Sequence, residues 1–131
     1  MILAEWGNEE KTIVRWTPQG RWTWEDVYEA NERVMTMLDD VPYPVGHIAD
    51  LQGSELMPPG AIKHLRYLFS QKRRESDFVI IVGASTVVRA LFQFLYNLPL
   101  PLFQESRMIM VSAMDEAYRV IAESGLESDS V

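Results

Sequence analysis

The sequence contains no cysteine, and this absence removes several classes of function at once. Disulfide bonds, thiol nucleophiles and cysteine-ligated metal sites all need that residue. Histidine is nearly as scarce, because His47 and His64 are the only two in 131 residues. Two imidazoles make a zinc site only with added carboxylates, and neither has an evident orienting partner for catalysis. We therefore expect no metal, no cofactor and no enzymatic activity.

Positive charge is also in short supply. The chain has 12 Lys and Arg residues against 19 Asp and Glu residues, which gives a formal net charge of −7. Nucleic acids and anionic membranes are bound through clustered positive charge, so the composition argues against both as partners. A net charge of this sign and size is common among soluble cytosolic proteins.

Long hydrophobic runs are absent as well. No stretch approaches the roughly 18 apolar residues of a membrane span, and the apolar start of the chain lacks the basic residues of a signal peptide. Apolar residues make up 47% of the 131 residues, enough for one domain with a real core. We expect a single cytoplasmic domain over residues 1–125 and a frayed polar tail over residues 126–131.

The most informative stretch that is present predicts a buried strand that leads directly into a helix. Phe78 to Val82 is an unbroken run of five β-branched or aromatic residues, typical of a strand covered on both faces. Gly83 ends it, and Ser85 or Thr86 supplies the N-cap of a helix that we expect over residues 87–98. A strand joined to a helix in this way is half of a βαβ unit.

The rest of the chain repeats this alternation of strand and helix. Two short strands joined by a Gly7-Asn8 turn predict a hairpin at the sheet edge. The expected strands span residues 2–6, 12–17, 45–51, 78–82 and 107–111, and the expected helices span 24–39, 60–73, 87–98 and a segment capped by Ser112. The order ββαβαβαβα predicts an α/β fold with a mainly parallel five-stranded sheet.

The helix over residues 87–98 is apolar on more than one side. One stripe is expected to pack inward: Val87, Leu91, Phe94, Leu95 and Leu98. A second apolar set lies beside it and predicts an interface or pocket: Val88, Phe92, Tyr96, Leu100 and Phe103. A helix of this kind is either buried under its own connector or contacts a hydrophobic ligand or a second copy of the chain.

Basic residues gather in one segment of this acidic chain. Residues 56–74 hold five Lys or Arg residues and no acid. Their helix is expected to turn Ile62, Leu65, Leu68 and Phe69 inward and His64 outward. The loop before it follows a parallel strand, where ligands gather in open α/β sheets, and the helix start offers free N–H groups. We predict a contact surface here for an acidic partner or a phosphorylated ligand: Asp50, Ser54, Pro59, Gly60, Lys63, His64, Arg66 and Arg73.

Three features of the chain keep alternative interpretations open. The basic helix face is either this contact surface or a solvated face that pairs with acids elsewhere, and Asp50 is either a general base or, more commonly, a brace for the loop. Four tryptophans crowd the first 24 residues: Trp6, Trp16, Trp22 and Trp24. They belong either to the core or to the lip of an interface or pocket near the hairpin.

The whole pattern resembles the STAS domain, a family named for sulphate transporters and anti-sigma factor antagonists. The likeness covers about residues 11–123 and rests on three segments: Ile48-Ala49-Asp50-Leu51 with Gly60 ten residues after Asp50, Val79 to Phe92, and Ile109 to Ile121. It also fits the related lipid-binding CRAL-TRIO-like branch. The resemblance implies a non-enzymatic regulatory domain that binds a partner protein or a second copy of itself, or alternatively a carrier of a small ligand or lipid.

One departure from the family changes what the resemblance implies. Antagonists of this family carry a phosphorylatable Ser immediately before the Gly that opens the second helix, and here that residue is Pro59. Proline has no hydroxyl, and Ser54 lies upstream without aligning with the switch. The resemblance therefore implies a binding domain without the kinase-operated switch.

Overall fold

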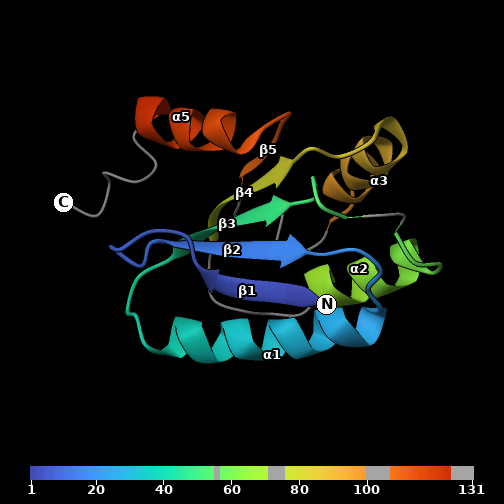
Figure 1. Ribbon diagram of the computed structural model, residues 1–131, viewed down its shortest axis with the longest axis horizontal. Helices are drawn as coiled ribbons and strands as arrows, with labels where there is room; N and C mark the ends of the chain where they lie inside the picture. The colour runs from blue at the N-terminus through green and yellow to red at the C-terminus, as the bar shows by residue number, and fades with distance from the viewer. Residues whose placement is uncertain (55–56, 71–75, 100–106, 125–131) are drawn as a thin grey trace.

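A five-stranded mixed sheet forms the middle layer of the computed structural model, which describes residues 1–54, 57–70, 76–99 and 107–124 (Figure 1). The strands, in their spatial order, are β1 (Ile2–Trp6), β2 (Ile13–Pro18), β3 (Val45–Asp50), β4 (Ser76–Val82) and β5 (Arg107–Val111). β1 and β2 form an antiparallel hairpin, and every later pair is parallel. The predicted sheet is confirmed, with the hairpin at its edge and β4 inside it.

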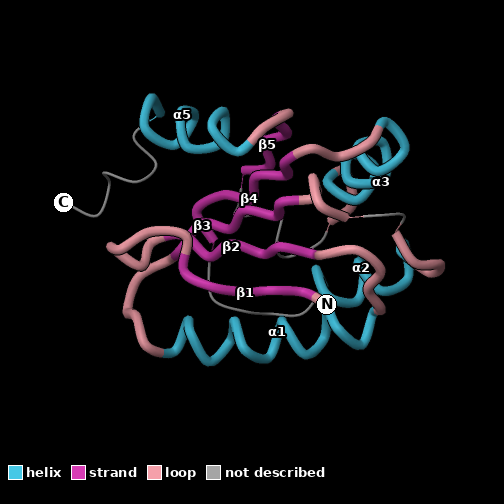
Figure 2. The backbone as a smooth tube through the Cα atoms, in the orientation of Figure 1, coloured by secondary structure: helices cyan, strands magenta, loops and turns pink. Residues whose placement is uncertain are grey.

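Three of the four helices in the described ranges cover the same face of the sheet. Strands β2 to β5 follow one another in space as they do in sequence, so right-handed crossovers place each connecting helix on one side. These helices are α1 (Trp24–Asp39), α2 (Ala61–Ser70) and α3 (Thr86–Tyr96). Helix α5 (Met114–Ser124) follows the last strand and covers the opposite face (Figure 2).

The two faces of the sheet are packed to different degrees. Under α5, the side chains of Ile13, Ile48, Phe78 and Ile80 are at most 1% exposed. Under α1, α2 and α3, seven buried side chains each keep 5–8% exposure: Ile2, Trp22, Trp24, Leu65, Leu68, Val79 and Phe92. These seven side chains therefore keep a residual exposure that the four under α5 lack.

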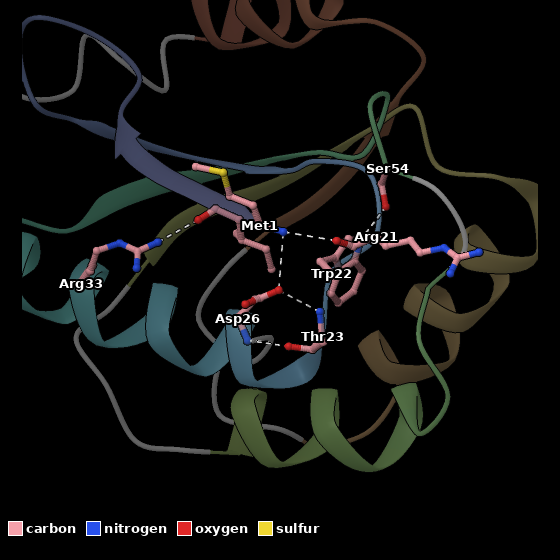
Figure 3. Close-up of polar contacts among 8 residues, drawn as sticks. Met1, Arg21, Trp22, Thr23, Asp26, Arg33 and Ser54 are labelled. Carbon is pink, nitrogen blue, oxygen red and sulfur yellow. Dashed lines mark hydrogen bonds and ion pairs between the residues drawn. The ribbon is translucent and has the colours of Figure 1, made fainter.

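Thr23 with Asp26 three residues later predicts a capping box at the start of α1, and the structure confirms it. Thr23 Oγ1 accepts a hydrogen bond from the Asp26 N–H at 3.1 Å, and Asp26 Oδ2 accepts one from the Thr23 N–H at 3.0 Å (Figure 3). The Thr23 backbone N–H is the main cause that lowers the pKa of the Asp26 carboxyl. The Met1 amino group also donates to this carboxylate, at 3.5 Å, and thereby ties the first strand to the first helix.

Two other helix starts differ from the prediction. Helix α2 begins at Ala61, because the carbonyl of Gly60 accepts the first bond, from the His64 N–H at 3.0 Å. Gly60 has a φ of 88°, which favours glycine, so Pro59 lies before the helix rather than at its first position. Helix α5 begins at Met114, where the Ala113 carbonyl takes that role, so Ser112 does not cap it.

Helix α3 begins with the predicted Ser85 cap but is turned relative to the prediction. Phe92 and Leu95 are buried, whereas Val87 is 79% exposed and Phe94 is 52% exposed. The predicted inner stripe was thus wrong for Val87 and Phe94. Phe92, which was predicted to lie beside that stripe, is buried.

On α2 the predicted inner stripe is right for Leu65 and Leu68 and wrong for Ile62, which is exposed. The side chain of Phe69 lies outside the described part.

Candidate functional site

Asp50 ends β3 with its carboxylate buried at the carboxyl edge of the sheet. Its Oδ2 accepts a hydrogen bond from Arg15 Nη2 at 2.9 Å, and its Oδ1 accepts one from the Gln52 N–H at 3.1 Å. The Asp50 side chain is 8% exposed and that of Arg15 is 34% exposed. Both oxygens are therefore engaged in bracing β2 and the loop after β3, which is the structural role expected for this residue.

Replacing Asp50 by asparagine should lower the free energy of unfolding by about 2 kcal/mol, because it leaves Arg15 without its charge partner. The matched control is Asp115→Asn, which breaks an exposed ion pair with Arg119 on the surface of α5. The control should cost less than about 1 kcal/mol. Urea unfolding of the two variants measures both, and equal losses would contradict the bracing role.

An aromatic cluster holds the start of α2 against α1. Trp24 Nε1 donates to the Pro59 carbonyl at 2.8 Å, and the Trp24 ring stacks on His64 with centroids 5.0 Å apart. The Tyr28 hydroxyl and His64 Nδ1 share a hydrogen bond of 2.8 Å. Burial raises the pKa of the Tyr28 hydroxyl, and Tyr67 adds to that shift, so the phenol stays neutral. His64 was predicted to face outward, but it is half-buried in this cluster.

The outer sides of α2 and α3 carry most of the large apolar side chains that are exposed in the described part of the chain. Six such side chains are exposed, and five of them, at 38–79%, belong to these two helices. Three exposed cations accompany them, and neither helix contains an acid. We call this set the basic apolar face: Ile62, Lys63, Arg66, Tyr67, Val87, Arg89, Phe94 and Tyr96.

The structure brings only some of the predicted contact residues to this face. Lys63, Arg66 and Tyr96 belong to it, and Pro59 and Gly60 are exposed in the turn before α2. The others are placed differently: Asp50 and Phe92 are buried, Val88 is half-buried, and half-buried Ser54 accepts a hydrogen bond from Trp22 Nε1 at 2.8 Å (Figure 3). Arg73, Leu100 and Phe103 lie outside the described residues.

A cavity of about 140 Å³ lies between the sheet and helices α1, α2 and α3. Its aromatic walls come from Trp16, Trp22, Trp24 and Phe92, and its floor includes Ala49 of β3. The seven side chains with 5–8% exposure named above all line it. The sequence offered a pocket as one interpretation of the crowded tryptophans and of Phe92, but it did not place a cavity between the sheet and these three helices.

The three indole N–H groups of the cavity wall already have acceptors within the protein. Trp16 Nε1 donates to His47 Nδ1 at 3.2 Å, Trp22 Nε1 to Ser54 Oγ at 2.8 Å, and Trp24 Nε1 to the Pro59 carbonyl. No Asp, Glu, Lys or Arg is among the described residues that line the cavity. The wall therefore offers mainly apolar ring and aliphatic surface.

Comparison with known proteins does not identify the chain. No protein-family model matches it, and no curated protein matches it in sequence. Within the part that the structure describes, no helix is long and apolar enough to cross a membrane, and no group of three or more His, Asp or Glu residues is placed to hold a metal ion. What is established is an α/β fold with a mostly parallel sheet, so a proposal about function must rest on the basic apolar face and the cavity.

Proposed function

We propose that this chain is a non-enzymatic, STAS-like domain that binds an acidic partner protein through the basic apolar face. The observation that carries the proposal is the concentration of exposed apolar side chains on α2 and α3. Large apolar side chains gathered on one part of a surface mark interaction sites. The same two helices carry the exposed cations Lys63, Arg66 and Arg89 and no acid, in a chain of net charge −7. Carboxylates on a partner would complement these cations.

A different protein fits this face better than a second copy of the chain does. A two-fold symmetric contact would set the three cations of one copy against those of the other, which is unfavourable. The exposed acids of α1, such as Glu25, Glu29 and Glu32, offer the right charge. However, no large apolar side chain of α1 is exposed to meet the apolar part of the face.

A membrane fits less well than a protein. Segments that bind anionic lipid headgroups carry clusters of about 4–8 Lys or Arg residues. Residues 56–74 and Arg89 supply six such residues, but the chain as a whole has a net charge of −7, which would oppose approach to an anionic surface. The alternation of strands and helices on a mostly parallel sheet supports the STAS-like assignment at the level of architecture.

Charge reversal on the face tests the proposal. The immobilised chain is exposed to extract of the source cell, and the retained proteins are compared among wild type, Lys63→Glu/Arg66→Glu and the control Arg107→Glu/Arg119→Glu. The control makes the same change of charge at exposed positions on β5 and α5. We expect an acidic protein to be retained by wild type and control and lost by the α2 variant.

Two further measurements separate docking from non-specific charge effects. Salt at about 1 M, which screens charges beyond about 3 Å, should weaken but not abolish retention if apolar contact contributes. The variant Ile62→Ser/Phe94→Ser, checked by circular dichroism to be folded, should lose the same protein while keeping all charges. Retention of identical proteins by wild type and both face variants would rule the proposal out.

A further inference from the structure

We propose that the cavity between the sheet and helices α1, α2 and α3 is a binding site for one small, uncharged, apolar molecule about the size of a single aromatic ring. The site is separate from the basic apolar face, because it lies on the inner side of the same helices. It rests on three properties of the cavity: its volume, the chemistry of its wall and the absence of charge.

The volume of the cavity sets the size of the ligand. Protein interiors are normally packed as densely as organic crystals, so a recess of about 140 Å³ between the sheet and its helices, partly open to solvent, leaves room for a ligand. An engineered cavity of about 150 Å³ lined by aliphatic and aromatic side chains stays dry and binds benzene or xenon. One ring therefore fits this space, whereas a long acyl chain or a nucleotide would extend out of it.

The chemistry of the wall sets the class of ligand. Trp16, Trp22 and Trp24 supply ring surface, and aromatic molecules pack favourably against such rings in offset or edge-to-face arrangements. Trp22 and Trp24 already meet edge to face, with centroids 5.2 Å apart and planes at 83°. Their N–H groups are bonded to Ser54 and Pro59, so the indoles contribute mainly apolar contact.

The absence of charge excludes ionic ligands from this site. A carboxylate or phosphate taken into apolar surroundings without a cation loses its hydration and gains no partner. No Lys or Arg lies among the described residues of the cavity wall, and the histidine that lines it, His47, accepts the Trp16 N–H at its Nδ1. Benzene and benzoate, which share a ring and differ by one carboxylate, are therefore the discriminating pair of probes.

The tryptophan side chains provide an internal control for the test. Trp16, Trp22 and Trp24 line the cavity, and Trp6, at the end of β1, does not. In ¹⁵N-labelled protein each indole N–H gives one NMR signal. Titration with benzene should shift the three cavity signals saturably and leave the Trp6 signal in place, and benzoate should shift none of the four. Absence of a benzene response, equal shifts of all four signals, or an equal response to benzoate would overturn the proposal.

Filling the cavity gives a second readout. Ala49 lines it from β3, and Ala49→Met places a longer side chain in the space, whereas Ala90→Met makes the same change on the exposed side of α3. Affinity for benzene should fall at least about tenfold in the first variant and stay unchanged in the second. If Ala49→Met does not fold, the smaller Ala49→Val should lower the affinity for benzene by a smaller factor. If the folded Ala49 variant binds benzene as tightly as wild type, the proposal is overturned. Lys63→Glu/Arg66→Glu should bind benzene with the affinity of wild type. A failure of the cavity proposal can therefore be told apart from a failure of the proposed function.

Discussion

Replacement of Gly46 by alanine should destabilise the protein by about 3 kcal/mol, at the upper end of the usual cost of overpacking. Gly46 lies in β3 beneath the ring of Phe78, and an added Cβ atom would overlap three atoms of that ring. Phe78 is 1% exposed and is packed under α5 among residues that are just as tightly buried, so its ring cannot move aside at low cost. Urea unfolding monitored by tryptophan fluorescence measures the loss.

A second glycine provides the control for this substitution. An added Cβ atom at Gly53 would have its nearest neighbour, the Pro18 carbonyl oxygen, at 3.9 Å. Gly53→Ala should therefore change the stability by less than about 1 kcal/mol. Combining Gly46→Ala with Phe78→Leu should cost at least about 1 kcal/mol less than the sum of the single losses, because the smaller side chain makes room. Equal stability of the two Gly→Ala variants would contradict the packing described for this face.

Trp24→Ala should cost about 3–5 kcal/mol, the range found for large-to-small substitutions of buried aromatic residues. Trp24 connects three parts of the structure, because it stacks on His64, meets Trp22 edge to face and donates its N–H to Pro59. Alanine would enlarge the cavity and release the turn that leads into α2. Thermal and urea unfolding measure the loss.

The variant Trp24→Phe separates ring volume from the hydrogen bond. It keeps an aromatic side chain in the cavity wall and removes the N–H that bonds to the Pro59 carbonyl, so we expect a loss of about 1–2 kcal/mol. The difference between the two variants then reports the packing of the ring. A loss below about 1 kcal/mol for Trp24→Ala would show that the aromatic cluster does not hold α2 in place.

The fold could be predicted because its signals are local. The apolar run from Phe78 to Val82 predicted an inner strand, and the capping residues Thr23, Asp26 and Ser85 marked helix starts that the structure confirms. The mainly parallel sheet followed from the alternation of strands and helices along the chain, which needs no knowledge of side-chain packing. The order of the elements and the mostly parallel sheet were therefore within reach of the sequence.

The faces of α3 and the environment of His64 could not be predicted, because both depend on contacts between distant segments. Helix α3 is apolar on most sides, so its periodicity fits several orientations, and the structure buries Phe92 and exposes Phe94. His64 was assigned outward as a polar residue, yet its ring is covered by Trp24 and Tyr28 from α1. The cavity is equally non-local, since its wall combines strands, loops and three helices.

The central claim, that the basic apolar face is a docking surface, is tested most directly by site-specific cross-linking inside the source cell. A photoreactive amino acid replaces Phe94 on α3 or, as control, Arg119 on α5, both of which are exposed and lie on opposite sides of the sheet. The account predicts a discrete adduct with an acidic protein from residue 94, lost when Lys63→Glu/Arg66→Glu is added, and no such adduct from residue 119. The same adducts from both positions, or none from residue 94, would contradict it.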